Sequence, residues 1–152
     1  MTFPALRTTL CAMIVSLAFA ASAQAASKGV FYECDMTSSQ RDSNWIAPKI
    51  GLVLFDTGQA KIVDPWVLRY MDGPLDVTPR TPRKDLVRVS WVLSNITTNI
   101  GKRLEPIRYR MDLNTVRKTA KVWASWTVYD GARYNGEGTC KVYDRVPKLP
   151  GL

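Results

Sequence analysis

Histidine is absent from this 152-residue chain, and cysteine is scarce. Without imidazole there is no Ser-His-Asp or Cys-His catalytic apparatus and no imidazole metal ligand. Only three cysteines are present, whereas a structural zinc site usually needs four nitrogen or sulfur ligands. Glycine-rich loops that open a helix and cradle phosphate are missing as well. We therefore expect neither a metal nor a cofactor.

Long hydrophobic runs are also lacking, apart from one near the start of the chain. It covers residues 10–21, follows a single basic residue, Arg7, and precedes the small-residue pattern Ala23-Gln24-Ala25. About 12 apolar residues are too few for a membrane-spanning helix, which needs roughly 20. The pattern instead predicts a secretory signal peptide over residues 1–25, cleaved after Ala25. Residues 26–152 are then expected to form a single β-domain, exported to the periplasm or the extracellular medium.

Negative charge is in short supply, since 21 Lys and Arg face 13 Asp and Glu. Loss of Arg7 with the signal would lower the formal net charge only from +8 to +7. The exported part also keeps one pair of cysteines, Cys34 and Cys140. An oxidising compartment favours a disulfide between them, and two reduced, buried thiols are the alternative.

The rest of the chain is predicted to form β-strands almost throughout, with no helix. Residues 37–44 and the proline-rich segment 72–82 are expected to be loops, because proline lacks a backbone donor. The expected strands cover residues 29–36, 50–55, 59–63, 85–94, 104–113, 119–129 and 137–144.

Hydrophobic alternation assigns one face of the central strands to the core. The inward residues are expected to be Val87, Val89, Trp91 and Leu93; Ile107, Tyr109, Met111 and Leu113; and Ala120, Val122, Ala124, Trp126 and Val128. One buried and one wet face is typical of an antiparallel meander. We predict a small all-β protein, an antiparallel β-barrel of about seven strands with one disulfide. A β-sandwich is the alternative.

Carboxylates are the remaining catalytic option in a chain without histidine. Glu33, Glu105 and Glu137 would be able to supply an acid and a base for glycoside cleavage if two of them faced one cleft. Nothing in the sequence pairs them, and charged side chains mostly stay solvated. We therefore expect a protein that is not an enzyme, with a carboxylate-based hydrolase as the alternative.

The wet face of the central strands carries the candidate binding site. A register that sets Arg110 opposite Trp123 and Asp112 opposite Lys121 avoids like charges and places a guanidinium over an indole. The resulting cationic and partly aromatic surface would comprise Arg88, Arg108, Arg110, Lys121 and Trp123. Such a surface suits an anionic polymer, a headgroup or an acidic protein surface. The competing interpretation is a solvated face whose tryptophan packs under a loop.

Two short motifs carry a family resemblance. Tyr32-Glu33-Cys34, and Gly131-Ala132-Arg133-Tyr134 ahead of Cys140, resemble fragments of the periplasmic inhibitors of C-type lysozyme, which are small barrels with a disulfide. The likeness covers about a dozen residues. The loop of that family begins with Ser-Gly near the middle of the barrel, whereas this chain has Asp130-Gly131 close to its end. The resemblance implies an enzyme inhibitor acting through residues 130–137.

The function expected from the sequence is thus an exported binding protein with a basic face for an anionic envelope component. An enzyme inhibitor of the lysozyme-inhibitor kind and a structural or assembly protein of the envelope are the alternatives.

Overall fold

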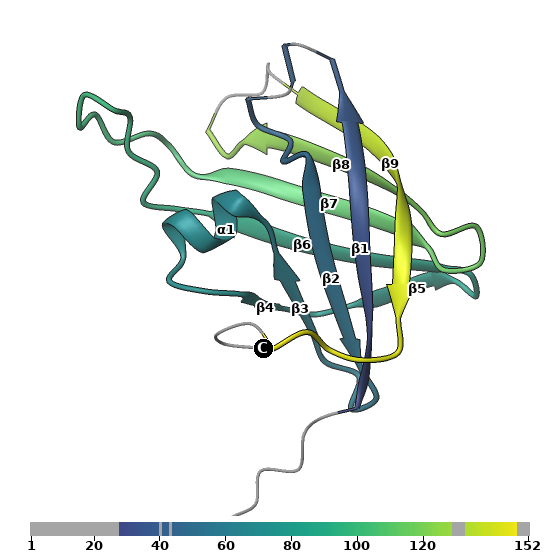
Figure 1. Ribbon diagram of the computed structural model, residues 1–152. Helices are drawn as coiled ribbons and strands as arrows, with labels where there is room; N and C mark the ends of the chain where they lie inside the picture. Colours follow the sequence, from purple (N-terminus) through teal and green to yellow (C-terminus); the bar gives the residue numbers. More distant parts are fainter. Residues whose placement is uncertain (1–27, 40, 43, 129–132, 149–152) are drawn as a thin grey trace, which may run out of the picture.

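The computed structural model describes residues 28–39, 41–42, 44–128 and 133–148. The proposed signal peptide, residues 1–25, lies outside them. The described chain forms one antiparallel sheet of nine strands in the order β4-β3-β2-β1-β9-β8-β7-β6-β5 (Figure 1). The elements are β1 (Gly29–Ser38), β2 (Lys49–Phe55), β3 (Ala60–Val63), α1 (Pro65–Tyr70), β4 (Leu75–Val77), β5 (Arg80–Arg83), β6 (Leu86–Leu93), β7 (Ile107–Asn114), β8 (Thr119–Trp126) and β9 (Arg133–Tyr143).

The sheet curls through 269° into a half-barrel that remains open. Its two edges are β4 and β5, which follow each other in the chain with only Thr78 and Pro79 between them. The all-β prediction is confirmed, and a single curled sheet replaces the two stacked sheets of the sandwich alternative. The closed barrel of about seven strands is corrected to an open half-barrel of nine.

The two additional strands come from the segment predicted to be a loop. Residues 72–82 contain β4 and most of β5, both of which lie at an edge of the sheet. Pro82 is tolerated in β5 because an edge strand has one side without ladder partners, so its missing N–H costs little. The prolines therefore mark edge strands and not the absence of strands.

A short helix was also missed by the sequence analysis. Asp64 caps α1 by accepting hydrogen bonds from the backbone nitrogens of Trp66 at 2.7 Å and Val67 at 2.8 Å, and Pro65 occupies the first turn. Six residues are too few to show helical periodicity, so only this cap was visible in the sequence. Within the described ranges, no helix is long and apolar enough to cross a membrane.

The expected register of β7 and β8 is confirmed, with Arg110 opposite Trp123 and Asp112 opposite Lys121. The predicted inward residues of β6, β7 and β8 line the core, with Val87 and Trp126 only partly buried. Val128 is the exception, because it lies beyond the end of β8 and is 63% exposed. Alternation holds only as far as the ladder that enforces it.

The predicted disulfide between Cys34 and Cys140 is present. The two cysteines lie directly opposite each other on β1 and β9, with their Cα atoms 3.9 Å apart. The bridge therefore joins the first and last strands, as expected, but at the middle of the sheet. Closure fails elsewhere, between β4 and β5.

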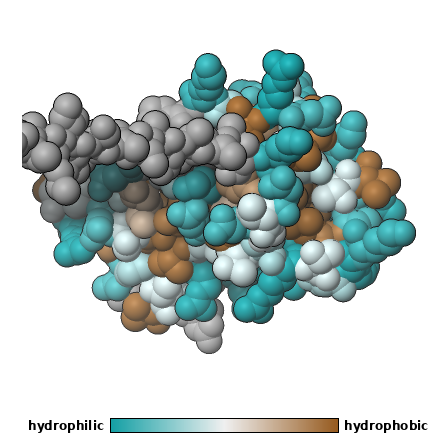
Figure 2. Space-filling model, turned by 90° about the horizontal axis from the view of Figure 1, so that it is seen from below, coloured by the Kyte–Doolittle hydropathy of each residue, from teal (hydrophilic) through white to brown (hydrophobic). Residues whose placement is uncertain are grey.

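A second apolar cluster lies on the outer face of β1, β2 and β3. It consists of Phe31, Val53 and Val63, with Phe55 and Val146 packed against them. The segment that follows β9 therefore returns over this face, and β2 is buried on both sides. From below, hydrophobic residues show as small groups among hydrophilic ones (Figure 2).

We predict that replacing both bridged cysteines, as Cys34→Ala with Cys140→Ala, lowers the free energy of unfolding by roughly 2 to 5 kcal/mol. The bridge spans 106 positions, and opening so long a loop restores much entropy to the unfolded chain. Urea unfolding of the variant against the oxidised protein measures the loss. Equal midpoints and slopes would show that the ladder between β1 and β9 suffices without the bridge.

Candidate functional site

The five candidate residues lie on one outer face of three neighbouring strands. Arg88 is on β6, Arg108 and Arg110 are on β7, and Lys121 and Trp123 are on β8. Their positions alternate with core residues such as Val89, Tyr109 and Val122. The cross-strand register sorts them into rows that run across the strands, and these rows differ in charge.

The first row neutralises two of the predicted cations. Arg88, Asp112, Lys121 and Glu137 follow one another across β6, β7, β8 and β9. Arg88 makes a two-pronged contact with Asp112, at 2.7 Å from Nε to Oδ1 and 2.6 Å from Nη2 to Oδ2. Lys121 Nζ lies 3.1 Å from Glu137 Oε2. Alternating charges leave this row with little net field for an anion.

The second row contains the predicted aromatic contact. The guanidinium carbon of Arg110 lies 4.2 Å from the ring centroid of Trp123, which is a close cation-π distance. Ser90 and Asn135 complete the row on β6 and β9. Arg110 Nε is 3.9 Å from Asp112 Oδ1, a long ion pair shared with Arg88. Trp123 is partly buried.

The third row holds two cations and no acidic residue. Val92, Arg108, Ser125 and Arg133 follow one another across the same four strands, and both arginines are exposed. Among the described residues, neither arginine has an ion pair. Arg108, Arg110, Trp123 and Arg133 together form what we call the arginine–tryptophan face.

Arg133 belongs to this face although the sequence analysis placed it in a loop. The final strand was expected to cover residues 137–144, with residues 130–137 as a loop. In the structure β9 begins at Arg133 and pairs with β8 from Ser125 onward. If the pairing of β9 with β8 is continued toward the start of β9 through the two glycines, Arg133 falls opposite Ser125.

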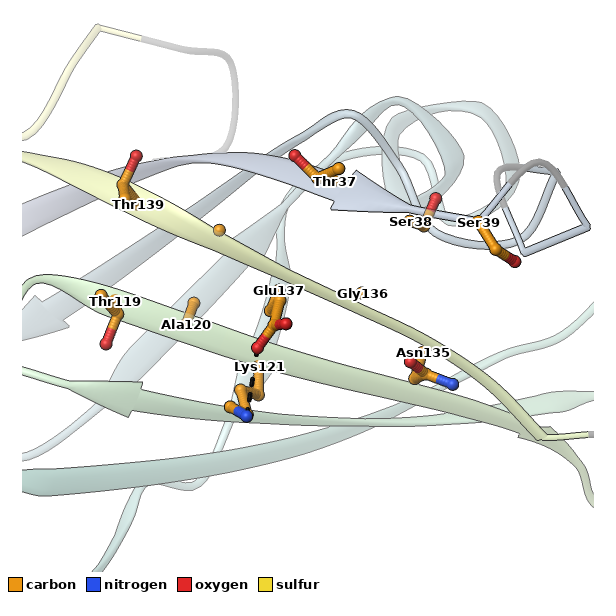
Figure 3. Close-up of a pocket in the computed structure, with 11 residues that line it drawn as sticks. Thr37, Ser38, Ser39, Thr119, Ala120, Lys121, Asn135, Gly136, Glu137 and Thr139 are labelled. Atoms are coloured by element: carbon orange, nitrogen blue, oxygen red, sulfur yellow. Dashed lines mark ion pairs between the residues drawn. The ribbon is translucent and has the colours of Figure 1, made fainter.

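A polar groove runs along the outer side of β9 toward this face (Figure 3). It encloses about 690 Å³, and its walls include Thr37, Thr119 and Thr139 around the Lys121–Glu137 ion pair. A smaller depression of about 140 Å³ continues it past Asn135 to Trp123. The hydroxyl groups of the groove therefore lie on the same outer face as Trp123.

Two of the candidate catalytic carboxylates, Glu33 and Glu137, are not brought together. Glu33 pairs with Lys49 at 3.0 Å, and Glu137 pairs with Lys121. Glu33 lies opposite Lys141 on β9, four positions from Glu137, which corresponds to about 13 Å along the strand. That separation exceeds the roughly 5 to 9.5 Å between the two carboxyl groups of glycosidases. Among the described residues, no group of three or more acidic, Cys or His side chains offers a metal site.

One carboxylate elsewhere has an unusual environment. Asp64 is only 3% exposed beneath α1, and this burial raises its pKa from 3.8 to about 6, against the opposing effect of its two backbone hydrogen bonds. Nearby, burial first and the Asp64 charge second raise the pKa of Tyr109. The Tyr109 hydroxyl donates to the backbone oxygen of Trp45 at 2.9 Å.

The residues that carry the family resemblance are divided between the two faces of the sheet. Cys34 faces the interior and Glu33 the outside, whereas Gly131 and Ala132 lie outside the described residues. Arg133 lies on the outer face, and Tyr134 packs inward near Trp45.

Comparison with protein-family models, with curated proteins and with solved structures found no match.

We predict that Asp64→Asn removes a pH dependence from folding. Between pH 4 and 6 the native state keeps a proton on Asp64 that the unfolded chain releases, so stability falls as pH rises through this window. A shift of about two pKa units corresponds to roughly 3 kcal/mol at neutral pH. Asparagine caps helices as well as aspartate does. The variant should therefore be the more stable protein at pH 7, and the two should converge near pH 3.5.

Thermal unfolding from pH 3.5 to 7.5 measures the difference between the two proteins. Parallel profiles would contradict a raised pKa. Asp64→Ala serves as the control for the cap, because it also removes the charge but loses about 0.5 to 2 kcal/mol of capping at every pH.

Proposed function

We propose that this protein is an exported, non-catalytic binding protein whose arginine–tryptophan face holds an anionic polymer of the cell envelope. The observation that carries the proposal is the exposed row of Arg108 and Arg133 beside the stacked pair of Arg110 and Trp123. Three cations and an aromatic ring share a patch in which, among the described residues, Asp112 is the one carboxylate paired with a member of the patch.

The spacing of the charges favours an extended ligand. Arg108 and Arg110 are two positions apart on β7, or about 7 Å, and Arg133 lies two strands from Arg108, or about 10 Å. A single small anion would contact one of these groups, whereas a polymer with repeating charges would engage several. The groove of threonines that leads to Trp123 adds polar contacts for a sugar-like backbone.

Export is supported by the hydrophobic segment at residues 10–21 and by the disulfide, since such bonds persist in oxidising compartments. The overall charge of +7 expected after signal cleavage would also attract acidic polymers over distances of about one Debye length.

We predict that Arg108→Gln weakens binding to immobilised heparin and flattens the salt dependence of binding by about one ion. Arg108 has no ion pair among the described residues, so its loss removes an uncompensated contact. The matched control is Arg117→Gln. Arg117 is an exposed cation in the turn between β7 and β8, roughly 20 Å from Arg108, and its loss changes the net charge equally.

The affinity of both variants for heparin, measured across a salt series, tests this prediction. A local site requires a larger effect at Arg108 than at Arg117. Equal effects would mean that only the net charge matters, and would overturn the proposed face.

Trp123→Ala should behave differently from the arginine variants. We predict a loss of roughly 0.5 to 2 kcal/mol in heparin binding with the salt slope nearly unchanged, since an indole contributes stacking and cation-π energy but no counterion release. The melting temperature should change little, because Trp123 lies on the outer face and belongs to neither apolar cluster of the described structure. A protein several kcal/mol less stable with unaltered affinity would show that Trp123 is structural.

A further inference from the structure

A second cavity opens at the end of the half-barrel from which the β6–β7 connection protrudes. It encloses about 500 Å³. Four aromatic rings line it, from Trp45, Trp66, Tyr70 and Tyr109, together with the apolar side chain of Leu93. A cavity of 300 to 1,000 Å³ with mostly apolar walls is the usual size and character of a small-molecule site. We call it the aromatic pocket.

Three segments outside the main sheet build its walls. They are α1, Asn44 and Trp45 ahead of β2, and residues 94–106, which extend past the end of β6 and β7 (Figure 1). This last connection is 13 residues long, and connections of that length are uncommon unless they serve a function. It is also ordered from within, since the Leu104 nitrogen donates to the Ile96 oxygen at 2.8 Å and Thr97 pairs with Arg103.

The aromatic walls are held in place from behind. The Tyr109 hydroxyl bonds the Trp45 backbone, and the Trp45 ring packs edge-on against Trp126 at 5.0 Å between centroids. Tyr109 itself stacks on Trp91 at 5.1 Å, with ring planes only 8° apart. Rigid walls of this kind lower the entropic cost of binding.

A positive charge at the rim of the aromatic pocket favours an acidic ligand. Arg69 is exposed, lines the aromatic pocket and lies 5.5 Å from the ring centroid of Tyr70. The other described residues that line the cavity carry no charge. The indole nitrogen of Trp66 is buried and has no hydrogen-bond partner in the described structure.

We propose that the aromatic pocket binds a small molecule with a planar apolar ring system and one acidic group, which Arg69 pairs at the rim. The rings of Trp45, Trp66 and Tyr70 stack on the planar part, and the cation fixes the orientation. This site is separate from the arginine–tryptophan face. It lies on the inner side of the sheet and shares no residue with that face.

The test uses two naphthalene dyes of nearly the same shape. Anilinonaphthalene sulfonate carries one acidic group, and N-phenylnaphthylamine is its uncharged counterpart. We expect each dye to bind the purified, folded protein at one saturable site, with energy transfer from tryptophan. Arg69→Gln should weaken the sulfonate about three- to tenfold and leave the uncharged dye unchanged. Thr97→Trp, which fills the cavity from an exposed position, should abolish binding of both.

The controls separate this site from the outer face and from unfolding. Arg117→Gln removes an equal charge far from the cavity, and Trp123→Ala alters the other site, so both should bind the dyes as the parent protein does. If Thr97→Trp lowers the melting temperature, Asn99→Trp fills the same cavity from its exposed loop.

Absence of saturable binding, or binding that survives both filled variants, would overturn the pocket. Equal loss of both dyes in Arg69→Gln, or no loss of either, would overturn the acidic ligand. The heparin measurements use none of the three pocket variants, Arg69→Gln, Thr97→Trp and Asn99→Trp. Failure of one proposal therefore leaves the other standing.

Discussion

The pairing of β1 with β9 is the interaction on which the rest of the structure depends. These strands are the first and last of the described sheet, yet they lie next to each other near its middle. Eight residue pairs and the disulfide between Cys34 and Cys140 hold them together. One half of the sheet grows outward from β1 through β2, β3 and β4, and the other grows from β9 through β8, β7, β6 and β5. Because the first and last described strands pair at the centre, β4 and β5 from the middle of the chain form the two open edges.

The sequence was informative where a ladder enforces alternation and uninformative at the edges. The inward residues of β6 and β7 were predicted because strands of eight residues pair on both sides there. The short strands β4 and β5 carry no such pattern, since edge strands have one neighbour and prolines are tolerated in them. The same limit hid the start of β9, where Gly136 and Gly138 replace inward side chains. Gly138 has no room for one, since a Cβ there would lie 2.0 Å from the Asp35 oxygen.

Part of the candidate site followed from the register alone. The contact of Arg110 with Trp123 was predicted because the competing register set like charges opposite each other. Which cations lack an ion pair among the described residues was not predicted, since that depends on β6 and β9 as well. Arg88 is neutralised from one side by Asp112, and Lys121 from the other by Glu137. A charge count cannot separate these residues from Arg108 and Arg133, whereas their rows across four strands do.

Both proposed sites depend on the alternation of a single strand. Along β7, Arg108 and Arg110 face outward into the arginine–tryptophan face, and Tyr109 between them faces inward to the aromatic pocket. A one-residue slip of β7 would exchange these faces, so the register that buries Ile107 and Met111 also fixes both sites. The two proposed sites lie on opposite faces of one sheet. Each contains an arginine beside an aromatic ring. The same register therefore orients two arginines of one proposed site and Tyr109 of the other.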